Sequence, residues 1–221
     1  MSIIRLPNGK LLYFAHVPKC AGTAIERYLE ARFGPLGMRD SSFAMRTPGA
    51  AWSLSPPQHM PEEVRRDLLP DSLFDGMFAA LRHPATRLRS AFLFKRDVDK
   101  ALPAQPPFHR WIETVPRSLA LNPYTLHGHL RPMTKCVPQA TATFRIEDGL
   151  DAVVQWLDAQ VGTQDGPHQI TPANVLSQRL GTQPDTVKLT PSILNTITTL
   201  YAADFDRFAY PINPQDMENS K

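Results

Sequence analysis

Residues 13–24 read YFAHVPKCAGTA, and this stretch decides the fold. The apolar run over residues 11–17 has an Asn-Gly pair before it and a proline after it, which predicts a buried strand. After a turn of small residues, apolar side chains recur at helical spacing, which predicts a helix over residues 23–33. The stretch therefore reads as a strand, a tight turn and the start of a helix.

The turn in this stretch has the parts of an anion-binding site. The first N–H groups of a helix have no intrahelical partner, and the helix dipole adds positive potential there. Gly22 lets the backbone approach a ligand, Thr23 adds a hydroxyl donor, and Lys19 adds a mobile positive charge. Because the lysine precedes the glycine, the loop is not the GxxxxGK[ST] phosphate loop. An ordinary solvated turn would use the same residues, and this stretch alone does not separate the two interpretations.

A second strand, turn and helix reads FAALRHPATRLRSAF over residues 78–92. The pattern predicts a strand over residues 77–81 and a helix over residues 84–97. Two successive units of this kind predict an α/β fold, a parallel sheet flanked by helices. Ligands of such sheets bind at the carboxyl ends of the strands.

The first residue after the second strand is a second candidate for anion binding. Arg82 precedes a helix whose dipole opposes its charge, so its position favours a bound anion. Ser90 lies about two turns into the helix, and it would donate to the same anion together with Arg87 or Arg89. The sequence thus predicts two anion sites at the ends of two strands that are neighbours in one sheet.

The length of 221 residues and the hydrophobic content of 42% suit one domain over residues 1–221, with its core over about residues 11–210. Residues 36–58 and 101–140 are predicted as irregular loops, the second because it contains seven prolines. The other predicted elements are a short helix from residue 61, a strand over residues 143–146, a helix over residues 150–161 and a last helix that Thr190 caps.

The net charge of +3 is small, so no nucleic-acid partner is expected. The charge fits a protein that holds a small polyanion in one basic cleft, and it equally fits an ordinary enzyme surface. Cys20 and Cys136 have no CxxC spacing, and we expect free thiols. No apolar segment is long enough to span a bilayer and the N-terminus does not resemble a signal peptide, so we expect a cytoplasmic protein.

The loops HVPKCAGT and LRHPATRLRSAF resemble the two cofactor loops of the carbohydrate sulfotransferases, sulfotransferase family 2. The resemblance is strongest to the heparan sulfate 2-O-sulfotransferase-like and chondroitin sulfotransferase-like group. The tail LYAADFDRFAY is also similar to the end of these domains, and LHGHLRPMTKC is similar more loosely. The sequence departs from the family pattern at His83, where aspartate is common, and at Phe92, where tyrosine is common.

This resemblance implies a sulfotransferase fold and the donor 3′-phosphoadenosine 5′-phosphosulfate (PAPS), with no metal. The acceptor it implies is a hydroxyl of a saccharide or glycolipid. The residues implied for the 5′-phosphosulfate are Pro18, Lys19, Cys20, Ala21, Gly22, Thr23 and Ala24. Those implied for the 3′-phosphate are Arg82 and Ser90.

Sulfuryl transfer needs a cation on the departing phosphate oxygen and a base for the acceptor hydroxyl. We assign the first role to Lys19. The resemblance implies that His59, in the segment PPQHMPEE, is the base, although an ordinary loop histidine is an equal alternative. The rival bases are three carboxylates, Glu62, Glu63 and Asp40.

His129 and Arg131 are candidates for acceptor contacts. Trp52 and Trp111 could stack on a sugar ring, but packing is the commoner fate of tryptophan. His127 and His129 alternate along the chain, but no third ligand is spaced to complete a metal site with them.

Two other functions remain open at this point. A nucleotide-dependent phosphoryl transferase would need a Gly-Lys-Ser or Gly-Lys-Thr loop and an acidic magnesium ligand after a second strand, and the sequence has neither. A non-catalytic anion-binding module would keep Arg82 and Ser90 but would not need Lys19 or His59.

Overall fold

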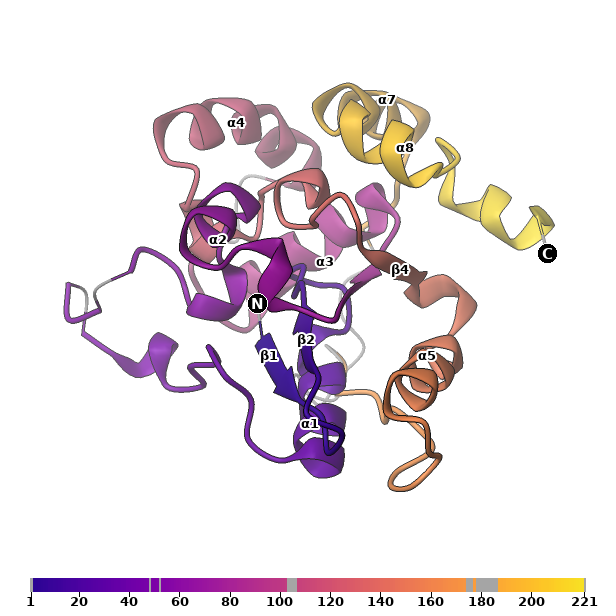
Figure 1. The fold of residues 1–221 in the computed structure, drawn as a ribbon. Coiled ribbons are helices and arrows are strands. Elements are labelled where there is room, and N and C mark those ends of the chain that lie inside the picture. The colour runs from indigo at the N-terminus through magenta and orange to yellow at the C-terminus, as the bar shows by residue number, and fades with distance from the viewer. Residues whose placement is uncertain are drawn as a thin grey trace. The chain divides into compact units, whose positions relative to one another are not determined.

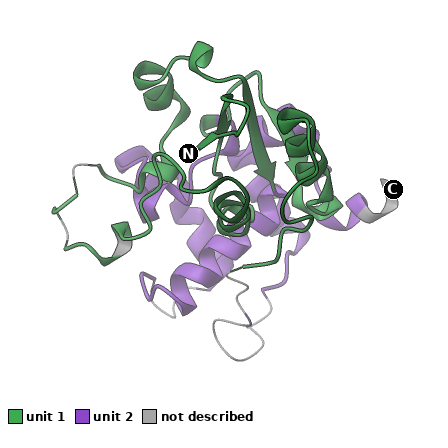
Figure 2. Ribbon diagram, turned by 60° about the horizontal axis from the view of Figure 1, so that its bottom comes forward, with its two compact units in different colours: residues 1–81, 135–173 green, residues 82–134, 174–221 purple. Residues whose placement is uncertain are grey.

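The computed structural model describes residues 2–47, 49–51, 53–102, 107–173, 177 and 187–220. The chain forms two compact units, and each unit combines two separate segments (Figure 2). Unit 1 consists of residues 1–81 and 135–173, and unit 2 consists of residues 82–134 and 174–221. One domain over residues 1–221 stays a prediction.

The strands are β1 (Ser2–Arg5), β2 (Leu11–Phe14), β3 (Gly76–Leu81) and β4 (Ala142–Arg145). The longer helices are α1 (Gly22–Phe33), α2 (Glu62–Leu68), α3 (Pro84–Asp97), α4 (Phe108–Leu121), α5 (Asp151–Val161), α7 (Pro191–Leu200) and α8 (Ala202–Phe208). No helix in the described part of the chain has the length and apolarity to cross a membrane.

The four strands form one sheet in the order β1-β2-β3-β4. Strands β2, β3 and β4 are parallel to one another, so the predicted α/β fold with parallel strands at its centre is confirmed. Strand β1 was not predicted; it pairs antiparallel with β2 at the edge of the sheet (Figure 1). The turn between them contains Gly9 at a φ of 88°, and this Asn-Gly pair was the available signal for a hairpin.

One face of this sheet packs against α1 and α5. Even-numbered strand residues such as Phe14 and Phe78, whose rings stack 4.8 Å apart, belong to the same buried cluster as Ile25 and Leu157 of the two helices. Burial of each such side chain stabilises the fold by about 1.5–3 kcal/mol. This packing holds β2 and α1 rigidly on either side of the YFAHVPKCAGTA turn.

Unit 2 contains a helix where the sequence analysis expected an irregular loop. Helix α4 runs through the proline-rich segment over residues 101–140, so that prediction was wrong over residues 108–121. Phe108, Trp111, Ile112 and Val115 form a buried helical stripe on it, and Pro116 lies inside the helix. The burial of two aromatic rings outweighs the one backbone hydrogen bond that a proline removes.

The last predicted helix is confirmed as α7. The hydroxyl of Thr190 accepts a hydrogen bond from the N–H of Ile193, and Pro191 takes the first helical position. Tyr201 is the C-cap of α7, and α8 begins at the next residue.

Candidate functional site

The loop after β2 enters α1 through two residues in the left-handed region. Lys19 has a φ of 69° and Ala21 a φ of 59°, a conformation that costs an L-residue about 1–2 kcal/mol. The first helical hydrogen bonds run from Ala24 and Ile25 to the carbonyl of Ala21, so the amides of Gly22 and Thr23 precede the helix ladder. A strained turn that leads its amides into a helix N-terminus is backbone geometry suited to an anion.

The side chains of this loop differ in their exposure. Lys19 and Thr23 are half-buried, whereas Pro18 and Cys20 are buried and help to shape the turn. The thiol of Cys20 lies 3.7 Å from the carbonyl of Pro18, and Cys20 and Cys136 are not bonded to each other.

The structure gives a second reason for a glycine at position 22, which was not predicted. A Cβ atom at this position would lie 2.0 Å from Nε2 of His16 and 2.2 Å from its Cδ2. The imidazole of His16 therefore occupies the space that any larger residue at position 22 would need. His16 lies two residues after β2, and its ring packs over Gly22, the first residue of α1.

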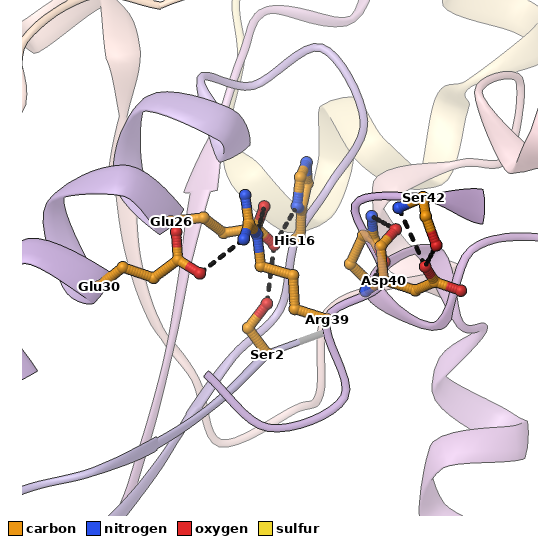
Figure 3. A network of polar contacts seen from close by, with 8 residues as sticks. Ser2, His16, Glu26, Glu30, Arg39, Asp40 and Ser42 are labelled. Carbon is orange, nitrogen blue, oxygen red and sulfur yellow. Dashed lines mark hydrogen bonds and ion pairs between the residues drawn. The ribbon is translucent and has the colours of Figure 1, made fainter. Parts of the chain in front are cut away.

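A buried carboxylate holds the other side of this imidazole (Figure 3). Nδ1 of His16 donates to Oε1 of Glu26 at 2.8 Å, and the hydroxyl of Ser2 donates to the same oxygen at 2.7 Å. Burial raises the pKa of Glu26, but the attraction and hydrogen bond of His16, together with Ser2, outweigh it and lower the pKa to about 2. Glu26 is thus an anion at neutral pH, and Nδ1 of His16 carries a hydrogen.

His59 lies against His16. The two ring centroids are 5.0 Å apart and the rings meet edge to face at 78°. The short helical turn Pro57–His59 carries His59, and Gln58 exchanges two hydrogen bonds of 3.2 Å with the backbone of Asp40. These contacts place the predicted base beside His16, which leads into residues 18–24, hereafter the lysine loop.

The three rival bases have other environments. Glu62 pairs with Arg65, whose side chain is fully buried and also binds Asp71 at 2.6 Å. The hydrogen bond from the hydroxyl of Ser42 is the largest cause that lowers the pKa of Asp40, which makes it a weaker base. Glu63 is exposed on α2. His59 contacts His16, two residues beyond β2, whereas Glu62 interacts with Tyr13 within β2.

In unit 2, Arg82 and Arg89 form a second cationic group. Nε of Arg82 donates to the hydroxyl of Thr86 at 3.3 Å, and that hydroxyl donates to the carbonyl of His83 at 3.1 Å. Burial and then the charge of Arg82 lower the pKa of Arg89. Two guanidinium groups close enough to repel each other favour a bound anion. Thr86, one helical turn after Arg82, is a polar contact that the sequence analysis missed.

A comparison with protein-family models matches residues 3–211 to the sulfotransferase family. The chain belongs to the sulfotransferase family. The match covers both candidate loops and confirms the family that the two motifs indicated. No curated protein and no solved structure matches the chain significantly.

Arg87 has a structural role in this sulfotransferase. Its side chain is fully buried, and it donates to the carbonyls of His129 at 3.2 Å and Arg131 at 2.9 Å. Arg89 is half-buried and donates a hydrogen bond to the carbonyl of Val187 at 3.4 Å, so of the two arginines proposed beside Ser90 it is the better candidate for an anion. Ser90 itself is half-buried on α3.

The predicted acceptor residues of the sulfotransferase are buried. His129 is 8% exposed and Arg131 is 4% exposed. The guanidinium of Arg131 donates to the carbonyl of Pro123 and lies over the ring of Tyr124. Acceptor contact by either residue stays a prediction.

Neither tryptophan gains support for a sugar contact. Trp111 packs 5.1 Å from Phe92 in an aromatic cluster and is 6% exposed. Trp52 lies outside the described residues. Within those residues, no three His, Cys, Asp or Glu side chains are grouped as metal ligands would be.

The two departures from the family pattern have local explanations. Nδ1 of His83 accepts from the N–H of Ala85 at 3.2 Å, so the histidine caps α3 as an aspartate would. Its Nε2 donates to the carbonyl of Pro211 at 2.8 Å. Phe92 packs 5.2 Å from Phe108, an apolar environment in which a phenol hydroxyl is not required.

Proposed function

We propose that this sulfotransferase-family protein transfers a sulfuryl group from PAPS to a hydroxyl of a saccharide or glycolipid. One observation carries the proposal: the two loops with family motifs follow strands that are parallel neighbours. Phe14 of β2 pairs with Phe78 of β3, and Arg82 is the first residue after β3. Carboxyl ends of parallel strands lie on the same edge of a sheet, where ligands of such folds bind.

The lysine loop is suited to the 5′ end of the donor. The amides of Gly22 and Thr23, the hydroxyl of Thr23 and the ammonium of Lys19 are donors for a phosphosulfate. Pro18, Cys20, Ala21 and Ala24 shape the turn, and their buried or small side chains leave the donor groups to the backbone. When bound, PAPS supplies the sulfuryl group that moves to the acceptor oxygen.

The arginine cluster is suited to the 3′-phosphate. Arg82 and Arg89 supply charge-assisted donors, and Thr86 and Ser90 supply hydroxyls from the same face of α3 at positions i and i+4. A dianionic phosphate would relieve the repulsion between the two guanidinium groups. This chemistry distinguishes a 3′-phosphorylated adenosine from ordinary nucleotides.

Two side chains have catalytic roles in this proposal. Lys19 stabilises the negative charge that grows on the departing phosphate oxygen. His59 accepts the proton of the acceptor hydroxyl, and its contact with His16 places it near the lysine loop. The acceptor would lie against residues 36–58 and 101–140, and the proposed acceptor contacts His129 and Arg131 belong to the second of these segments.

We expect Lys19→Ala to reduce turnover by roughly 10²–10³-fold, because it removes one preorganised positive charge from the transition state. Adenosine 3′,5′-bisphosphate should still bind, since the loop amides remain. Alanine keeps the Cβ atom in the left-handed position, so the fold should be unchanged. Transfer of radiolabelled sulfate to desulfated heparan and chondroitin measures the effect, and Lys100→Ala is the matched control, because Lys100 is an exposed lysine that also has a positive φ. Equal turnover in the two variants would remove Lys19 from the mechanism.

We expect His59→Ala to reduce turnover by roughly 10²–10⁴-fold with little change in bisphosphate affinity. His168→Ala is the control, because His168 is an exposed histidine of the same unit. Undiminished transfer by the His59 variant would assign the base role to a carboxylate. Tight bisphosphate binding without transfer to any saccharide or glycolipid by the unmodified protein would favour the non-catalytic module.

A further inference from the structure

We propose that His16 is a positioning residue, which Glu26 holds between the lysine loop and His59. The inference rests on the proposed function, because it assigns His59 as the base. It goes further by giving a task to a buried histidine–carboxylate pair that is not among the residues assigned to the donor or to proton transfer.

Glu26 fixes the orientation of the His16 ring. The carboxylate is 3% exposed and accepts the Nδ1 hydrogen of His16 (Figure 3). The carboxylate is itself fixed, because Ser2 donates to it and Nε of Arg39 lies 3.3 Å from its second oxygen. Arg39 is held in turn by Glu30 at 2.5 Å. The imidazole therefore cannot turn about its own axis without losing a buried hydrogen bond to a charged group.

The fixed ring contacts the lysine loop on one side. Its Nε2 edge fills the space above Gly22, so that even one added methyl group would lie 2.0 Å from the ring. Such a separation is far inside van der Waals contact. The position of the ring and the position of the first residue of α1 are thus coupled.

The same ring contacts His59 on another side. His59 meets it edge to face with centroids 5.0 Å apart, while the ring of Phe14 stacks against it at 5.7 Å. One imidazole therefore touches both the glycine of the lysine loop and the proposed base. Its removal would take away one ring that His59 packs against, and a proton acceptor displaced by about 1 Å can lose roughly 100-fold in rate.

A double-variant cycle tests the coupling to the loop. We expect Gly22→Ala to weaken adenosine 3′,5′-bisphosphate binding by roughly 10-fold or more, because the methyl group pushes the His16 ring into its surroundings. In a His16→Ala background the space is vacated, so the same change should alter the calorimetric Kd by less than about threefold. An equal loss in both backgrounds would mean that the ligand itself requires Gly22, and it would overturn the inference.

Histidine-ring NMR of the full chain tests the coupling to His59 without any ligand. The Nδ1-bound proton of His16 should be seen in the unmodified protein and in His168→Ala, and it should shift in Glu26→Gln. The His59 ring signals should move in His16→Ala and stay in place in His168→Ala. Unmoved His59 signals would overturn the inference, even if Gly22→Ala does not fold.

Steady-state kinetics separates positioning from a merely structural role. With desulfated heparan as acceptor, His16→Ala should reduce kcat by roughly 10- to 100-fold and leave KM for PAPS within about threefold. Glu26→Asp should recover part of the kcat lost in Glu26→Gln, because it restores the charge. An equal loss in kcat/KM through KM alone would contradict positioning. If the unmodified protein binds no bisphosphate, the proposed function fails, whereas the NMR comparison still decides the role of His16.

Discussion

Single residues in this chain carry strain or charge that the fold alone does not require. Lys19 and Ala21 adopt left-handed conformations, and Arg82 lies close enough to Arg89 to lower its pKa. Such features persist where they serve a ligand. The sequence indicated Lys19, Gly22 and Arg82 because the motifs are local, but it could not indicate the pairing of His16 with Glu26, which depends on how β2 and α1 pack.

The repulsion between Arg82 and Arg89 predicts that one substitution affects ligand affinity and thermal stability differently. Arg82→Ala should weaken adenosine 3′,5′-bisphosphate binding by roughly 10- to 100-fold, because it removes charged hydrogen-bond donors. The same change should leave Tm unchanged or raise it, since Arg89 loses a repulsive neighbour. Calorimetry and thermal unfolding measure the two effects, with Arg110→Ala as the exposed control. A drop in Tm with unchanged affinity would contradict the proposed ligand role.

His83 makes the stability of the fold dependent on pH. Burial lowers the pKa of this histidine, so at mildly acidic pH the unfolded chain binds a proton that the folded chain does not. Its contribution is complete above its ordinary pKa of 6.5 and is lost as pH falls. His83→Asn keeps an acceptor for the N–H of Ala85 but does not titrate. Urea unfolding from pH 5 to pH 8 should therefore depend less on pH in the variant, and identical slopes would refute this assignment.

The helices and strands that turn residues and apolar spacing mark within one short segment were predictable. Strand β1, which depends on pairing with another segment, was not. Strand β2 with α1, strand β3 with α3, and α7 with its Thr190 cap each follow from turn residues and apolar spacing within one short segment. Strand β1 was missed because four residues stabilise a strand only through their pairing with β2. Helix α4 was missed because proline count was given more weight than the apolar period of Phe108, Trp111, Ile112 and Val115.

Pro116 in α4 gives a prediction at this scale. Proline is roughly 3 kcal/mol less favourable than alanine inside a helix. Proline also restricts the unfolded chain, which offsets about 1 kcal/mol of this cost. Pro116→Ala should therefore raise the free energy of unfolding by about 1–2 kcal/mol. Urea unfolding measures the change, and bisphosphate affinity should be unaffected. A destabilised variant would mean that α4 needs the proline for its packing.

For the molecule as a whole, the two motif loops belong to different compact units. The lysine loop is part of unit 1, and Arg82 is the first residue of unit 2, joined directly to the last residue of β3. The family match runs through both units, from residue 3 to residue 211. The acceptor could not be predicted from the sequence, because residues 36–58 carry no motif and the stretch LHGHLRPMTKC in the second segment resembles the family only loosely.

The central claim is that one nucleotide uses both loops, with its 5′ end at Lys19 and its 3′-phosphate at Arg82. Titration calorimetry of the full chain with adenosine 3′,5′-bisphosphate, adenosine 5′-monophosphate and ATP tests this claim most directly. The account predicts that the bisphosphate binds at least roughly tenfold more tightly than the monophosphate, as one charge-assisted phosphate contact requires, and that ATP binds more weakly than the bisphosphate. Equal affinity for the two adenosine phosphates, or a preference for ATP, would contradict it.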